Sequence, residues 1–121
     1  KNMAPSVQHT IQCPKISIDL DTAVPVALIT SELVTNSFKH VFPTEKEDNK
    51  LSIIVKHNKD SEIELTISDN GIGLPQDFKL TDAEGLGFEI IHKLCRQIGA
   101  KFSWDASSSG TTFKLIFKQR S

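Results

Sequence analysis

Four polar side chains fall on one stripe of a helix predicted around residue 30. Glu32 and Asn36 are four residues apart, and Lys39 and His40 follow about one turn later. Side chains at this spacing are neighbours on a helix, so a carboxylate, an amide oxygen and a cation form one row. That row suits a hydrated divalent cation with phosphates, because Mg²⁺ keeps several waters and takes few protein ligands. A solvated surface helix would have the same composition, so the helix alone leaves both interpretations open.

A carboxylate followed by glycines ends one of the predicted strands. Asp69 precedes the run 70–73, which contains Gly71 and Gly73. A carboxylate at the rim of a sheet can accept a hydrogen bond from an exocyclic amine such as that of adenine, and glycines let the backbone approach a flat ring closely. The Asn-Gly pair is also typical of a hairpin turn. Residues 74–75 lead into a polar stretch rather than a returning strand, which favours the first interpretation.

Two further glycine motifs follow. Gly85 and Gly87 flank Leu86 just before a predicted helix, where unpaired N–H groups favour a phosphate, although a flexible turn would have the same sequence. Residues 74–84 fit a mobile lid over a ligand or an ordinary surface loop. Gly110 and Thr111 begin the last predicted strand. A simple glycine turn followed by β-branched strand residues would have the same sequence.

The helix that carries the polar row has clear local signals. We expect Asp21 or Thr22 to cap it, with Pro25 in its first turn, where a missing N–H is harmless. We expect it to end at about Val41, before Pro43.

Alternating apolar residues predict the sheet around this helix. Residues 1–10 show little pattern and are predicted to be irregular, and residues 11–20 predict an edge strand or two. A second helix should start at about Phe88 and end with Gly99 as its C′ residue. The predicted fold is an α/β (α+β) two-layer sandwich with a mixed, mostly antiparallel sheet and helices on one face. The other predicted strands are 51–57 and 63–68, which form a hairpin, a strand containing 102–104, and 111–117.

Composition limits the function. A chain of 121 residues has room for one domain, predicted over residues 1–121, and a formal net charge of −1 gives no electrostatic case for nucleic acid. Cys13 and Cys95 are isolated, which favours a reducing, cytoplasmic setting. No apolar run approaches the length of a membrane span, so we expect no direct membrane contact by this chain. The chain begins at Lys1 rather than Met, which suggests a piece of a longer parent, whether or not that parent is membrane-bound.

In this order the motifs resemble the ATP-binding catalytic domain of sensor histidine kinases, within the superfamily of gyrase, Hsp90 and MutL ATPases with the Bergerat-type fold. Residues 32–40 resemble the family's N box, 69–73 its first glycine box, and 85–87 its second. Residues 110–111 resemble its terminal glycine-threonine motif. The resemblance covers nearly everything from Asp21 to Lys118. Phe88 departs from the Leu-like residue expected after the second glycine box.

The resemblance implies a role for each matching residue. Asn36 would ligate Mg²⁺, Asp69 would read the adenine amino group, and Thr111 would support Asp69. Glu32 matches the residue that activates water in the ATPase relatives, so its role as a general base here is a hypothesis. The nucleotide-binding set implied by the motifs is Asn36, Lys39, His40, Asp69, Gly71, Gly73, Leu74, Gly85, Leu86, Gly87 and Thr111.

The implied function is protein histidine kinase activity with ATP and Mg²⁺. The γ-phosphate would go to a histidine on a separate dimerisation segment of a homodimeric parent, and then to a response regulator. No histidine of this chain has the helical setting of such an acceptor. Two alternatives stay open: a serine kinase that restrains a sigma factor, and an ATP-hydrolysing module of the gyrase or MutL type.

Overall fold

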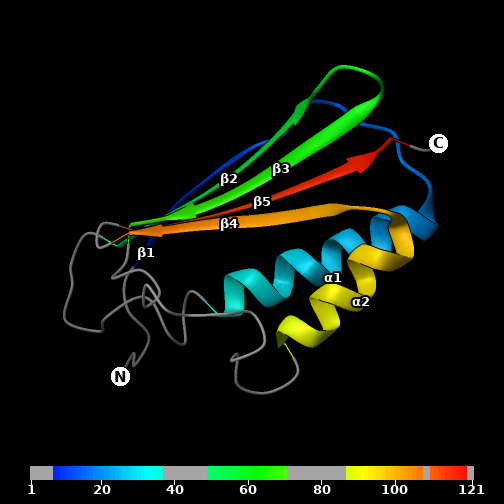
Figure 1. Ribbon diagram of the computed structural model, residues 1–121. Coiled ribbons are helices and arrows are strands. Elements are labelled where there is room, and N and C mark those ends of the chain that lie inside the picture. The colour runs from blue at the N-terminus through cyan, green and yellow to red at the C-terminus, as the bar shows by residue number, and fades with distance from the viewer. Residues whose placement is uncertain (1–6, 37–48, 71–86, 108–109, 120–121) are drawn as a thin grey trace.

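The computed structural model describes residues 7–36, 49–70, 87–107 and 110–119, which form one sheet with two helices on the same face (Figure 1). The five-stranded sheet has the order β1-β2-β3-β5-β4. The predicted two-layer α/β sandwich is confirmed. The elements in chain order are β1 (Val7–Gln12), α1 (Leu20–Asn36), β2 (Asn49–His57), β3 (Glu62–Asp69), α2 (Gly87–Ile98), β4 (Lys101–Ser107) and β5 (Gly110–Lys118).

The sheet is mixed, because β1 pairs parallel to β2 while the other neighbours are antiparallel. The prediction of an irregular segment over residues 1–10 is wrong for residues 7–10, which belong to β1. Its hydrogen-bonding partner lies far along the chain, so the local pattern gave no sign of it. One or two edge strands were predicted within residues 11–20. The structure has one there, because residues 11–12 belong to β1 and residues 13–19 contain no strand.

The β2–β3 hairpin and strand β5 follow the predicted alternation. Leu51 pairs with Asp69 at one end of the hairpin, and residues 58–61 connect the two strands at the other. In β3 and β5 every second side chain is buried against the helices. The buried hydrophobic residues of the core are Ile29, Leu33, Leu51, Ile63, Leu65, Ile67, Ile91, Cys95, Ile98, Phe113, Leu115 and Phe117.

Helix α1 begins earlier than predicted. The N-cap is Asp19, whose Oδ1 accepts the backbone N–H of Thr22 at 3.0 Å, rather than Asp21 or Thr22 itself. Pro25 therefore lies inside the helix and not in its first turn, and its missing N–H removes the bond that the carbonyl of Asp21 would accept. The predicted end near residue 41 lies outside the described residues.

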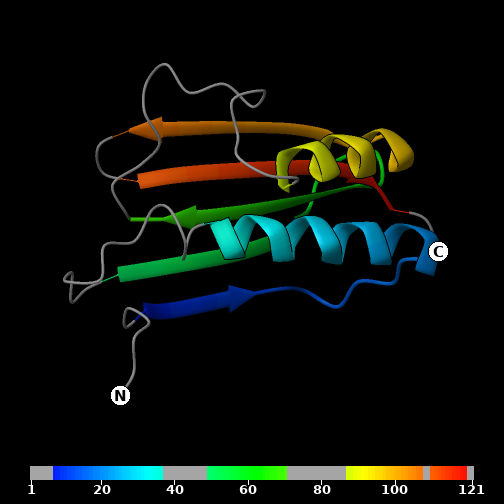
Figure 2. The same cartoon turned by 90° about the horizontal axis from the view of Figure 1, so that it is seen from below.

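Helix α2 ends as predicted, with Gly99 at C′. Its φ of +68° is left-handed, and the N–H of Ala100 donates to the carbonyl of Cys95 at 2.8 Å, which is the long bond of a Schellman motif. The two helices pack against each other and run in opposite directions across the sheet (Figure 2). The C-terminus of α1 and the N-terminus of α2 consequently lie toward the same end of the molecule.

Candidate functional site

Asp69 is the last residue of β3, between β2 and β5. The register pairs it with Leu51 on one side and Thr111 on the other. Directly opposed residues project to the same face of a sheet, and both partners are buried. The carboxylate of Asp69 therefore belongs to the helix-covered face, at the end of the sheet. The backbone N–H of Thr111 donates to Asp69 Oδ1 at 3.2 Å, which fixes the carboxylate against β5.

The side chain of Thr111 is buried beside this carboxylate. Its exposed fraction is 1%, and Oγ1 has no hydrogen-bond partner among the described residues. A buried hydroxyl without a partner is unfavourable, so such groups usually serve a ligand or an ordered water. A polar ligand bound at Asp69 would give this hydroxyl its missing partner.

Gly110 brings β5 close to the end of β3. Its φ is +150°, and a Cβ at this position would lie 2.0 Å from the carbonyl oxygen of Asp69. No side chain fits there without moving the backbone. The glycine therefore allows the close approach through which the next residue, Thr111, reaches the carboxylate.

The predicted metal-binding row begins on the last turns of α1. Glu32 is half-buried, and Asn36 is the final residue of the helix. Helix α1 and strand β3 run toward the same end of the molecule and finish there (Figures 1 and 2). The structure thus brings the backbone positions of Asn36 and Asp69 to one end of the sandwich. The side chain of Asn36 lies outside the described residues, as do Lys39 and His40.

The glycine-rich segments are described only at their edges. Gly87 is the first residue of α2, so the helix N-terminus expected to receive a phosphate is present, toward the same end as Asp69. The other predicted residues of these segments, Gly71, Gly73, Leu74, Gly85 and Leu86, lie outside the described residues.

Residues 7–121 match the family described as "Histidine kinase-, DNA gyrase B-, and HSP90-like ATPase". The chain belongs to this ATPase family. The resemblance inferred from the motifs is confirmed, and the chain is similar to proteins named as histidine kinases.

Two curated relatives of the ATPase domain are named as histidine kinases. The blue-light-activated histidine kinase 2 of Erythrobacter litoralis (strain HTCC2594) is 23% identical over 110 residues, which cover 91% of this chain and 32% of the relative. The sensor histidine kinase PdtaS of Mycobacterium tuberculosis (strain ATCC 25618 / H37Rv) is 27% identical over 97 residues, covering 77% of this chain and 19% of the relative. The chain thus spans about a third or less of these relatives.

Solved structures show the same fold. The histidine kinase domain of the Erythrobacter litoralis EL346 blue-light activated histidine kinase superimposes with a TM-score of 0.86 at 21% identity, over 93% of this chain and 55% of that one. The mycobacterial sensor histidine kinase MprB superimposes with a TM-score of 0.67 at 18% identity, over 94% and 81%.

The ATPase domain also has a small cavity that the sequence did not predict. Its volume is about 220 Å³, and its lining includes Lys50, Ser52, Ser68, Asp69 and Asn70. Ligand pockets for drug-sized molecules start at roughly 300 Å³, so this cavity suits a few waters rather than a whole nucleotide. None of the described side chains of α1 lines it.

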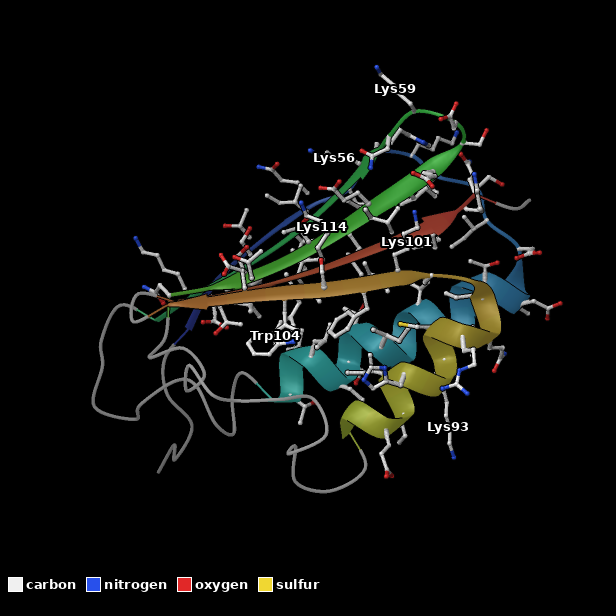
Figure 3. The ribbon with its side chains drawn as sticks, viewed as in Figure 1. Lys56, Lys59, Lys93, Lys101, Trp104 and Lys114 are labelled. Atoms are coloured by element: carbon white, nitrogen blue, oxygen red, sulfur yellow. The ribbon has the colours of Figure 1, made fainter. Side chains whose placement is uncertain are left out.

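Lys56 and Lys114 form an ionic network with Glu64 on the far face of the sheet. Lys56 and Lys114 project on the side opposite Trp104 and the helices (Figure 3), with their Nζ atoms 3.6 and 3.9 Å from Glu64 Oε2. The hydrogen bond from Asn58 is the largest cause that lowers the pKa of Glu64. Lys114 and Lys56 lower this pKa further, while burial opposes them. These groups form a surface network rather than a phosphate site.

None of the helices in the described part of the ATPase domain is long and apolar enough to cross a membrane. Within the same residues, no group of three or more His, Cys, Asp or Glu side chains could hold a metal ion.

Proposed function

We propose that this domain binds Mg²⁺-ATP and presents the γ-phosphate to a histidine on a separate dimerisation segment, from which the phosphoryl group passes to a response regulator. The observation that carries the proposal is the pair formed by Asp69 and Thr111. Their arrangement supports recognition of adenine, because a fixed carboxylate and a buried hydroxyl lie side by side on the helix-covered face.

Asp69 would accept a hydrogen bond from the exocyclic amine of adenine. The hydroxyl of Thr111 would donate to a ring nitrogen, or to a water that bridges to it. A base that carries a carbonyl in place of the amine would set two hydrogen-bond acceptors, its carbonyl oxygen and the carboxylate, against each other. Sites built to hydrogen-bond a substrate reject such analogues strongly, so the domain should prefer ATP to GTP.

The phosphates would lie between the ends of the two helices. Gly85, Leu86 and Gly87 would supply backbone N–H groups at the N-terminus of α2, and Lys39 and His40 would add positive charge. Gly71, Gly73 and Leu74 would shape the opposite, adenine-binding end. Asn36 would give Mg²⁺ one neutral oxygen ligand, and the metal would offset phosphate charge. A single protein ligand is compatible with Mg²⁺, which takes its other ligands from phosphate and water.

In the transfer itself, a nitrogen of the acceptor histidine would form a bond to the γ-phosphorus as the bond from that phosphorus to the bridging oxygen breaks. ADP would leave. Little covalent work falls on this domain, since positioning and neutralisation of charge account for most of the catalysis of phosphoryl transfer. Glu32, half-buried on α1, would polarise or deprotonate the attacking group as a general base.

The rest of the phosphorelay lies in other polypeptide segments. We place the acceptor histidine on the dimerisation segment of the same or a partner kinase chain, in a homodimeric parent. The setting would be cytoplasmic, whether or not that parent is membrane-bound.

Nucleotide titration tests the site. Asp69→Asn should weaken ATP binding by at least tenfold, because an amide that offers its N–H₂ to the amine repels it. Asn36→Ala should remove the Mg²⁺-dependent part of the affinity. Glu62→Gln, on the far face of the sheet, is the control and should leave binding unchanged. Wild-type affinity in both site variants would refute the assignments, and phosphate release that depends on Glu32 without any histidine acceptor would favour an ATP-hydrolysing module.

A further inference from the structure

Asn70 holds the start of β2 with both its backbone and its side chain. Its N–H donates to the carbonyl of Lys50 at 3.2 Å, and the N–H of Lys50 donates to Asn70 Oδ1 at 2.7 Å. In an antiparallel ladder two opposed residues exchange both bonds through their backbones. Here the ladder ends at the pair Leu51 and Asp69. In the next pair, the Oδ1 of Asn70 accepts the bond that its backbone carbonyl would otherwise accept.

Because a side-chain oxygen accepts this hydrogen bond, strand β3 can end at Asp69 while the N–H of Lys50 keeps an acceptor. Side-chain oxygens of Asn are suited to this, because they reach the same backbone donors as a carbonyl of the main chain. The end of a strand otherwise frays, because no further hydrogen-bonded pair follows it along the ladder. Asn70 therefore closes the β2–β3 pair at the position where the adenine-reading carboxylate begins.

We propose that Asn70 is a positioning residue for adenine recognition, acting through Asp69; the inference rests on the proposed function. Asp69 is held from β5 by the N–H of Thr111 at 3.2 Å. On the side of β2, the hydrogen bonds between Asn70 and Lys50 fix the peptide that follows Asp69. The carboxylate is thus clamped between two strands. Loss of either clamp widens the range of positions that it samples, and recognition depends on pre-organised geometry.

The test compares ATP with purine riboside triphosphate, which lacks the exocyclic amine. In the wild-type domain the ratio of the two dissociation constants measures how well Asp69 reads that amine. Asn70→Ala should weaken ATP binding about three- to tenfold, the usual effect of one hydrogen bond, and should weaken binding of the analogue less. The ratio should therefore shrink. Asn70→Asp keeps an acceptor at the same place and should keep most of the ratio.

Asn58→Ala is the matched control. Asn58 stands at the other end of the same hairpin, where its Nδ2 donates to Glu64 Oε1 at 3.1 Å. Its replacement should lower the denaturation midpoint without changing the ratio. A role of Asn70 in stability alone would make Asn70→Ala behave in the same way, with both nucleotides affected equally.

The outcomes separate this inference from the proposed function. A wild-type domain that binds ATP no better than the analogue counts against the adenine site itself. A wild-type preference that survives Asn70→Ala, or that Asn70→Ala and Asn70→Asp abolish equally, overturns the positioning role alone. Amide hydrogen exchange of Lys50 in the wild-type domain gives a second measurement that needs no variant: protection supports the clamp, and exchange at the rate of an open chain overturns it.

Discussion

Replacing Gly110 by alanine should damage both the fold and the nucleotide site. The new Cβ would lie 2.0 Å from the carbonyl oxygen of Asp69 and 3.1 Å from its carbonyl carbon. Ordinary contact begins near 3.4 Å, so the two backbones must separate by roughly 1.4 Å. Overpacking of this kind costs about 1–3 kcal/mol, and the φ of +150° adds about 1 kcal/mol for a residue with a side chain. We expect Gly110→Ala to lower the free energy of unfolding by about 3 kcal/mol.

The same displacement moves Asp69 away from the N–H of Thr111. ATP affinity should therefore fall by at least tenfold, measured below the denaturation midpoint of the variant. Gly99→Ala is the control, since Gly99 also has a positive φ, of +68°, but a Cβ there meets nothing within 4 Å. It should cost only about 1 kcal/mol and leave affinity unchanged. The reasoning fails if chemical denaturation finds Gly110→Ala no less stable than Gly99→Ala, or if titration finds ATP affinity intact.

Three other tests concern the hydroxyl of Thr111, the carboxylate of Glu64 and the two cysteines. Thr111→Val should raise stability by about 1 kcal/mol in denaturant titrations, because it removes an unpaired buried hydroxyl, while weakening ATP binding; lower stability would mean that the hydroxyl has a partner. Glu64 has a pKa below its ordinary value of 4.5, so it stabilises the fold above that pH and ceases to as pH falls through the lowered pKa. Glu64→Gln should flatten the acid limb of the stability profile, and an unchanged limb would contradict this. Burial raises the pKa of Cys95, so a thiol reagent should modify the exposed Cys13 first and reach Cys95 only in denaturant; equal rates would speak against the packing.

Local patterns predicted the parts of the fold that depend on nearby residues. The alternation in β3 and β5 and the glycine at the end of α2 needed only a few neighbouring positions, and both are confirmed. The start of α1 was misplaced because Asp19, Asp21 and Thr22 can all cap a helix, and the sequence alone does not rank them. Strand β1 was missed over residues 7–10 because its partner lies beyond α1.

The candidate site required information of a different kind. The glycine motif drew attention to Asp69, but its bond to Thr111 depends on a register between strands that are far apart in the sequence. The sequence suggested no role for Asn70 beyond the alternative of a hairpin turn, of which an Asn-Gly pair is typical. Its hold on Lys50 appears only when β2 and β3 are aligned. Motifs predicted the chemistry, and the pairing of strands supplied the hydrogen-bond partners.

The parallel pairing of β1 with β2 has a consequence for the order in which the molecule assembles. Antiparallel neighbours such as β2 and β3 meet through a short turn, but β1 reaches β2 only after the chain from Gln12 to Asn49, including α1, has crossed the sheet. Closing so long a loop costs more entropy than closing a hairpin. Strand β1 should therefore join last during refolding and detach first under mild denaturant, which pulsed hydrogen exchange would resolve strand by strand.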